Sequence, residues 1–346
     1  MGFYTIINLP PRTALAVAAL LLGCPALADQ LLMKDGSRLL GTVVNQDGGN
    51  TLDFATTYAG LIKVKWVEVD KVITEQAMTL LLADGETLQV ISAQNTPDGV
   101  ATVAASGAAE IFSLNEVAYV NPEPWRLGEG WNWAGRVNGV LNYERGNSDK
   151  DEYEADFAMT MRRIDDRIKL NGDYDREKNN GALSDDNWRI ASRYDHFVND
   201  QLFYGGTIGL EHDRFADLQS RTIIGPLLGY EFYEGVNLNL DVAGGPVYVK
   251  ENFYAADNDD HVSLGWQFNF DHFLIPGQVQ FYHRHNGLLD VSESDNLVWD
   301  SWTGLRFPIY AGIVASTEVQ IEYDGGAPND VDDSDTTYNI KLGYEW

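Results

Sequence analysis

The chain has little of what most helical membrane proteins and disulfide-stabilised proteins contain. Its 346 residues include one cysteine, Cys24, which excludes an intramolecular disulfide and any cysteine-based metal cluster. Beyond the N-terminus there is no run of eighteen apolar residues, so the sequence offers no transmembrane helix. Basic residues are scarce: 24 Lys and Arg stand against 52 Asp and Glu, a formal net charge of -28. This acidity argues against nucleic acid as a partner, because phosphate binding requires basic patches.

The C-terminal stretch alternates strictly between apolar and polar positions. Apolar side chains stand at Tyr338, Ile340, Leu342, Tyr344 and Trp346, with polar residues or glycine between them. This period of two indicates a β-strand with one apolar and one polar face. A final strand that ends on an aromatic residue, here Trp346, fits a bacterial outer-membrane barrel, although a strand of a soluble sandwich shows the same alternation.

The N-terminus has the features of an export signal. A basic residue precedes an apolar run over residues 14–22, and an A-x-A cleavage site follows at residues 26–28. We therefore predict a secretory signal peptide over residues 1–28 that is removed from the mature protein. The alternative is a lipobox over residues 21–24, which would leave a lipidated Cys24. In both cases the chain is exported.

Residues 29–124 contain one small β unit twice. Asp35-Gly36 and Asp84-Gly85 each stand between apolar runs, as two-residue hairpin turns do, and lie 49 positions apart. The closing pieces, residues 66–72 and 113–120, align at nearly the same spacing. We predict a duplicated β module whose copies pack together, because so small a unit buries little core alone. The module has no His and no Cys, and we interpret it as a spacer or binding domain in the periplasm.

Alternation returns at Trp131 and continues to the C-terminus. We count about twelve strands in residues 125–346, an even number, with a spacing that suits membrane-length strands and their turns. The connections alternate between short segments such as 199–201 and long ones such as 177–186 and 325–335. Short periplasmic turns and longer outer loops are the asymmetry of an outer-membrane barrel. The predicted fold is therefore all-β: an antiparallel transmembrane β-barrel of about twelve strands, preceded by the duplicated module.

The polar face of these strands carries charges that the core of a soluble protein does not tolerate. We therefore predict that the polar face lines the lumen and that the apolar face contacts lipid. The predicted lumen-facing charges are Arg136, Asp156, Arg162, Lys169, Asp173, Arg189, Arg193, Glu318, Glu322 and Lys341. Long side chains could largely fill so narrow a barrel, and an open pore should prefer cations because acidic residues are in excess.

Several runs resemble a known family. Residues 135–148, 170–176, 188–197 and 221–232 are similar to the YdiY-like family of salt-induced outer-membrane β-barrel proteins, a domain family of unknown biochemical function. The resemblance covers roughly residues 131–346 and implies an outer-membrane barrel. It implies no catalytic residues, because the family has none established.

The barrel segment lacks a clear catalytic constellation. An acyl hydrolase needs a serine and a histidine within hydrogen-bonding reach, oriented by a third polar group. His283 and His285 share a strand face, and His196 lies at a short turn beside Asp195, but no serine of motif quality accompanies them. We predict that the protein is not an enzyme and uses no cofactor, and we interpret the histidines as interfacial or lumen side chains.

Two acidic loops are the weak candidates for a metal site. One contains Asp257, Asp259 and Asp260, and the other contains Asp330, Asp332, Asp333 and Asp335. Clustered carboxylates suit Ca²⁺ or Mg²⁺, but the second run lacks the glycine and terminal glutamate of an EF-hand. Solvated acidic loops are the favoured interpretation, with weak binding of divalent cations as the alternative.

Together these features predict a monomeric protein of the Gram-negative outer membrane with a non-enzymatic envelope or stress role, in one version as a narrow, porin-like, cation-preferring channel. The expected partners are outer-membrane lipid, lipopolysaccharide and the barrel assembly machinery. Two alternatives stay open: a lipid-active outer-membrane hydrolase, and a surface protein that binds ligands through its acidic loops.

Overall fold

The computed structural model describes residues 28–46, 51–96, 99–104, 107, 109–112, 116–144, 149–235, 237–292, 296–325 and 333–346. Cys24 and all but the last residue of the predicted signal peptide lie outside these ranges. The chain splits into two compact units, Met1–Glu123 and Pro124–Trp346. We describe each unit by itself.

The first unit is a single antiparallel sheet of nine strands. The strands are β1 (Asp29–Met33), β2 (Arg38–Asn45), β3 (Thr51–Thr56), β4 (Gly60–Lys65), β5 (Val69–Leu82), β6 (Thr87–Thr96), β7 (Gly99–Ala104), β8 (Ala109–Phe112) and β9 (Val117–Val120). They are arranged as β4-β3-β2-β1-β5-β6-β7-β8, with β9 paired to β5, and a 3-10 turn, η1 (Trp66–Glu68), precedes β5. The long strand β5 therefore joins the two halves of the sheet.

The register of this sheet reproduces the internal repeat. In the first copy Leu31 pairs with Val72, and in the second copy Leu80 pairs with Val120. Each pairing is followed by a bulge one or two residues further along. Equivalent residues of the two copies thus occupy equivalent places, which confirms the duplicated module predicted from the Asp-Gly spacing.

The two Asp-Gly turns have the same geometry. Gly36 and Gly85 have φ angles of 87° and 89°, a region that glycine adopts without a steric penalty. The Asp35 and Asp84 carboxylates accept hydrogen bonds from the amides of Ser37 and Glu86 at 2.8 and 3.0 Å. The bond from Ser37 lowers the pKa of the Asp35 carboxyl. Each turn fixes the register of its hairpin through the same local hydrogen bonds.

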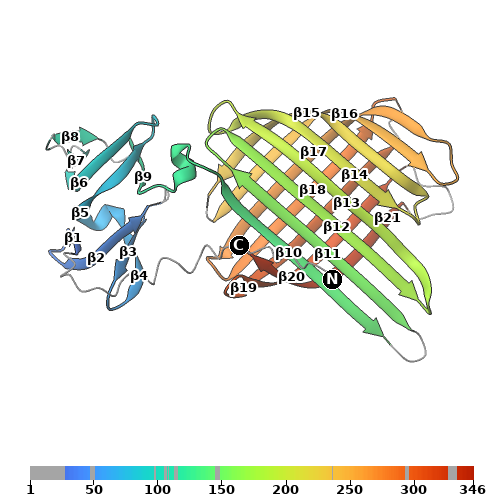
Figure 1. Cartoon of the computed structure of the whole chain (residues 1–346), viewed down its shortest axis with the longest axis horizontal. Helices are drawn as coiled ribbons and strands as arrows, with labels where there is room; N and C mark the ends of the chain where they lie inside the picture. Colours follow the sequence, from blue (N-terminus) through green and yellow to red (C-terminus); the bar gives the residue numbers. More distant parts are fainter. Residues whose placement is uncertain are drawn as a thin grey trace, which may run out of the picture. The chain divides into compact units, whose positions relative to one another are not determined.

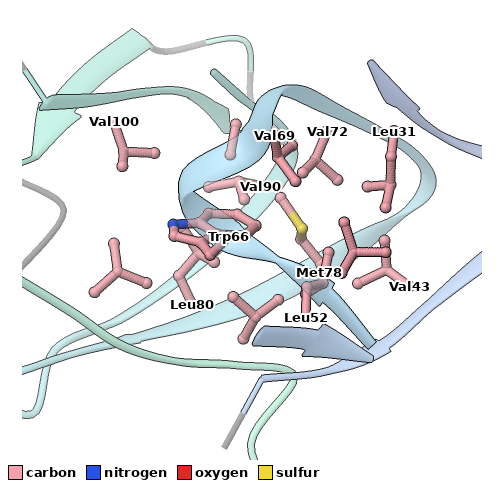
Figure 2. Close-up of a cluster of buried hydrophobic side chains, with 14 of the residues drawn as sticks. Leu31, Val43, Leu52, Trp66, Val69, Val72, Met78, Leu80, Val90 and Val100 are labelled. Atoms are coloured by element: carbon pink, nitrogen blue, oxygen red, sulfur yellow. The ribbon is translucent and has the colours of Figure 1, made fainter. Parts of the chain in front are cut away.

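The module has a conventional apolar core. Leu31, Leu52, Phe54, Leu80 and Val120 are completely buried, and both copies contribute to one continuous cluster. Figure 2 shows how Trp66, Met78 and Leu80 approach one another within this cluster. The copies share a core that neither could form alone, which agrees with the small size of each unit.

The second unit is a closed antiparallel barrel of twelve strands (Figure 1). A 3-10 turn, η3 (Pro124–Leu127), leads into β10 (Asn132–Glu144), β11 (Lys150–Arg162), β12 (Asp166–Asn179), β13 (Ala182–Phe197), β14 (Leu202–Asp213), β15 (Leu218–Glu234), β16 (Leu238–Phe253), β17 (Asp259–Ile275), β18 (Val279–Asp290), β19 (Leu297–Tyr310), β20 (Ile313–Asp324) and β21 (Ser334–Glu345). The predicted fold class and strand number are confirmed. No helix in the described residues is long and apolar enough to cross a membrane.

Two ends of the barrel can be distinguished by their connections. At the short-turn end the strands are joined by brief links such as residues 163–165 and 311–312, and at the long-loop end by links such as 291–296 and 325–333. The predicted long loop over residues 177–186 is wrong. Asn180 and Gly181, with φ angles of 49° and 79°, form a two-residue hairpin turn, so β12 and β13 continue almost to their tip.

The closure between the first and last strands is the shortest ladder of the barrel. All thirteen residues of β10 pair with β11, whereas only Arg136–Gly139 pair with β21. Trp346 extends this seam by exchanging two backbone hydrogen bonds with Gly135, at 3.0 and 3.2 Å. A Cβ atom on Gly135 would lie 2.5 Å from the Trp346 ring, so any larger residue at this position would displace that ring.

Candidate functional site

Ion pairs between distant strands identify the inner face of the barrel. Arg189 on β13 donates to Asp300 on β19 at 2.8 Å, and these strands are separated by five others in either direction around the barrel. A contact between opposite walls has to pass through the lumen. Arg189 therefore crosses the full width of the barrel, and it also reaches Glu322 on β20 at 3.1 Å.

Strand pairing then assigns the remaining side chains to a face. Residues directly opposite in the ladder point to the same side, so the row through Arg189 includes Asp173, Asp156 and Asn138. By this criterion the structure places all ten residues named from the sequence on the inner face: Arg136, Asp156, Arg162, Lys169, Asp173, Arg189, Arg193, Glu318, Glu322 and Lys341.

The outer face is apolar and exposed. Leu141, Ile224, Leu228 and Ile340 leave between 50% and 79% of their surface uncovered. Aromatic pairs lie toward both ends of the strands, among them Trp299 with Tyr323 and Tyr344 with Trp346. An apolar band bordered by aromatic residues is the surface that a barrel presents to a lipid bilayer.

The short-turn half of the lumen holds a compact cluster of buried charges. Arg193 donates to Asp241 at 2.5 Å, and the two lie on β13 and β16. Arg167 donates to Asp195 at 2.8 Å and also pairs with Glu231 on β15. All of these residues are at most 4% exposed. Lys169 also pairs with Asp241 at 2.5 Å, so three cations match three carboxylates and the cluster avoids the penalty for isolated buried charges.

Aromatic rings stack against the arginines of this cluster. The guanidinium groups of Arg167 and Arg193 lie 5.1 and 5.3 Å from the centre of the Phe203 ring. Closer to the short turns, Arg162 lies 4.1 Å from the Phe197 ring and pairs with Glu234 at 2.8 Å. Cation–π contacts of this kind hold the planar groups in place, so this part of the lumen is packed as well as paired.

Carboxylates outnumber cations in three further groups of the lumen. Arg189 is surrounded by Asp173, Asp300 and Glu322, and Arg221 by Glu211 and Glu251. Lys341 bridges three carboxylates, namely Glu154, Asp156 and Glu318. Each of these groups therefore has a negative net charge, in contrast with the balanced cluster around Arg193.

One group near the short-turn end has the opposite sign. Arg284 and Arg306 both donate to Asp271, at 2.8 and 3.3 Å. Arg136, on the first barrel strand, lies close enough for its charge to interact with both of these arginines. With Asp156, which also interacts with Arg136, this group contains three guanidinium groups and two carboxylates, so the acidic excess does not extend through the whole lumen.

Among the described residues, no hydrogen bond joins a serine to His196, His283 or His285. His283 and His285 lie on the outer face with stacked rings 6.4 Å apart, and the His283 Nδ1 contacts the Thr303 hydroxyl at 2.8 Å. His196 also points outward and pairs with Asp166 at 3.0 Å, whereas its neighbour Asp195 points into the lumen. The interfacial interpretation of His283 and His285 agrees with this placement.

The structure covers only part of the predicted acidic loops. Asp330 and Asp332 lie outside the described residues, while Asp333 and Asp335 are described without forming a group with a third ligand. Asp259, from the other loop, begins β17. It lies near Glu251 and His261, a combination that was not predicted from the sequence.

Several inner-face residues were also missed from the sequence. Arg167, Glu231, Asp271, Arg284 and Arg306 have the same alternation as the predicted lumen charges, which was the signal available. Which residues they pair with depends on how far each strand is shifted along its neighbour in the closed barrel, and a single sequence does not specify this shift.

Residues 138–346 match the family described as "Protein of unknown function, DUF481". The match spans more than half of the chain. The chain belongs to this family. The YdiY-like resemblance and its extent are thereby confirmed, and the family description assigns no activity to the site. No protein with a curated description matches the sequence.

The chain is also similar to several solved structures. The alignment with the NanC porin covers 62% of this chain and 99% of the porin chain, at 12% identity and a TM-score of 0.39. The KdgM porin has the same coverages, at 9% identity and a TM-score of 0.34. The alignment with the outer-membrane channel DcaP of Acinetobacter baumannii covers 92% of this chain and 94% of the DcaP chain, at 10% identity and a TM-score of 0.30.

Proposed function

We propose that the chain is a non-enzymatic, monomeric outer-membrane barrel that conducts small cations through a narrow, charged lumen. The observation that carries this proposal is the bridge from Arg189 to Asp300, which joins opposite walls in the middle of the barrel. In this proposal small ions pass beside the Arg189 side chain and through the charged cluster below it, whereas large solutes are excluded. The apolar outer face and the export signal support placement in the outer membrane.

The preference for cations follows from the charge around this bridge. Three carboxylates surround the single guanidinium of Arg189, and two surround Arg221. Rings of carboxylates in a pore lower the energy of cations and raise that of anions. The group formed by Arg136, Arg284 and Arg306 opposes this preference near the short turns, so we expect moderate selectivity.

The connections between the strands indicate how the barrel is oriented in the membrane. Outer-membrane barrels place short turns in the periplasm and longer loops outside the cell. Since the chain enters β10 at the short-turn end, residues 29–124 belong to the periplasm in this proposal. The barrel assembly machinery would insert the barrel from the same side.

Lipopolysaccharide is the proposed lipid partner at the long-loop end of the outer face. Tyr153, Tyr174, Arg176 and Lys178 line a cavity of about 330 Å³ there. The Arg176 Nε is buried and has no hydrogen-bond partner among the described residues. Cations next to aromatic rings at this level suit the phosphate groups of lipopolysaccharide, because charge-assisted bonds to phosphate are strong.

Single-channel recording tests the proposal. We expect the refolded full-length chain to give reproducible steps in a planar bilayer, with a reversal potential that indicates cation preference under a salt gradient. Arg189→Gln should increase the conductance several-fold, because it removes the bridge across the lumen.

Arg221→Gln is the matched control. It also removes a guanidinium that pairs with carboxylates, but Glu211 and Glu251 lie on the two strands beside its own and not across the lumen. Equal conductance changes in both variants would contradict the constriction at Arg189. Silence from the wild type and from Arg189→Gln would contradict the channel and favour a structural envelope role.

A further inference from the structure

A histidine and two carboxylates converge on the inner face near the long-loop end. Glu251 lies near the end of β16, and Asp259 and His261 lie at the start of β17. The register pairs Glu251 with Asp259 and Val249 with His261, so the three side chains share one face. Their potential ligand atoms all lie within 4.8 Å of one another.

The spacing of these atoms is close to that of a metal site. Two ligands of a tetrahedral zinc ion are about 3.4 Å apart, because zinc–nitrogen and zinc–oxygen bonds are about 2.1 Å long. A shift of about 1 Å would therefore bring the ligands into position. The Asp259 side chain is 59% exposed and free to make this movement, while His261 and Glu251 are each held at 10% exposure.

The charges around this group favour a divalent cation. Arg221 pairs with Glu211 at 3.0 Å and with Glu251 at 2.5 Å, and Asp259 contacts the His261 Nδ1 at 3.0 Å. With a neutral imidazole, the three carboxylates and one guanidinium leave two unbalanced negative charges. A divalent cation would balance them.

A small cavity with an unpartnered hydroxyl adjoins the same residues. Glu251, His261 and Ser263 line a space of about 10 Å³, about the size of one water molecule. Ser263 is 1% exposed, and its Oγ has no hydrogen-bond partner in the described part of the chain. Because buried hydroxyls are almost always satisfied, this one points to an ion or an ion-bound water in the cavity.

We propose that Glu251, Asp259 and His261 bind one divalent metal ion of the zinc class. An imidazole nitrogen with two carboxylate oxygens suits zinc and its transition-metal neighbours, whereas calcium and magnesium prefer oxygen ligands alone. The binding itself does not depend on conduction. Its location at the outer mouth of a channel rests on the proposed function.

Titration calorimetry with zinc chloride tests the site in the refolded, metal-stripped full-length chain. We expect one zinc ion per chain, and weaker binding by about tenfold or more in His261→Gln and in Asp259→Asn. Asp259→Asn changes an exposed side chain and should fold normally. Cobalt(II) bound to the wild type should give visible absorption bands that change in His261→Gln.

His196→Gln is the matched control, because His196 contacts Asp166 at the same 3.0 Å as His261 contacts Asp259 but has no third ligand among the described residues. It should bind zinc like the wild type. The site is refuted if the wild type does not bind zinc, if His261→Gln binds as tightly, if His196→Gln is weakened equally, or if calcium binds as tightly as zinc. Conductance recorded on the same preparation reports separately on the channel.

Discussion

The module and the barrel place apolar and charged side chains in opposite ways. In the module, Leu31, Leu80 and Val120 are buried, and the Lys63–Asp53 ion pair lies at the surface. In the barrel, Arg193 and Asp195 are buried, while Leu228 and Ile340 are the exposed residues. Both units are built from antiparallel strands with the same alternation, so alternation fixes two faces but does not determine which of them points inward.

The difference shows how each interior is stabilised. Contacts between apolar groups hold the module together, and such contacts do not require a particular orientation of the side chains. The barrel interior depends on pairs such as Arg193 with Asp241, which require matching geometry on non-neighbouring strands.

Loss of one buried cation should destabilise the barrel strongly. Arg193→Met leaves Asp195 and Asp241 with an incomplete set of partners, and we expect a loss of about 3 to 5 kcal/mol in the free energy of unfolding. Urea unfolding in micelles, followed by tryptophan fluorescence, measures it. Lys63→Met removes a cation from an exposed pair at 3.3 Å and should change stability by less than about 1 kcal/mol. Comparable effects of the two changes would refute the contrast.

A cavity in the module should destabilise the module alone. Leu80→Ala removes a fully buried side chain, and we expect the unfolding free energy of the module to fall by about 2 to 5 kcal/mol. Limited proteolysis should then cut residues 29–123 sooner while the barrel stays resistant. Leu40→Ala, at a position that is 45% exposed, is the control and should behave like the wild type.

A charge introduced on the outer face can distinguish a lipid-facing surface from one that faces water. Ile224 is 50% exposed near the middle of β15. In a bilayer, Ile224→Arg should destabilise the barrel by about 2 to 4 kcal/mol, whereas an exposed residue of a soluble protein would tolerate it. Folding titrations in lipid vesicles provide the measurement, with Ile224→Val as the control. A neutral outcome for the arginine variant would exclude a lipid-facing position.

The smallest expected effect concerns the repeated turns. Gly85→Ala should reduce the stability of the module by about 1 to 2 kcal/mol, because alanine is strained at a φ of 89°. No neighbouring atom lies within 4 Å of the added Cβ, so a steric clash should not add to this cost. Gly36→Ala should have a similar effect, since its φ is 87°. Thermal unfolding monitored by circular dichroism compares them, and a clear difference between the two would contradict the equivalence of the copies.

Much of the fold could be predicted from the sequence because β alternation is local. The period of two predicts the twelve strands and the inner positions of Arg136 and Lys341. The Asp-Gly pairs predict the repeated turns. Asn180-Gly181 is a hairpin signal in the sequence, and the prediction of a long loop over residues 177–186 followed instead from the polar residues around it. Lumen strands are polar on one face, so a polar run alone does not mark their end.

The site was less predictable, because its contacts join residues far apart in the chain. Arg189 and Asp300 are 111 positions apart, and their meeting depends on how far each strand is shifted along its neighbour when the barrel closes. The group formed by Glu251, Asp259 and His261 depends on the register of one hairpin. The sequence showed Asp259 only as part of an acidic loop.

The short seam between β10 and β21 has a consequence for aggregation. The two strands that meet there lie far apart in the sequence, and Trp346 provides two of the backbone bonds that join them. Without these bonds and the short ladder beside them, the barrel is an open sheet with two unpaired edges, which can pair with other chains. Closure at this seam therefore also protects the protein from edge-to-edge aggregation, and a variant that lacks residues 342–346 should aggregate more readily.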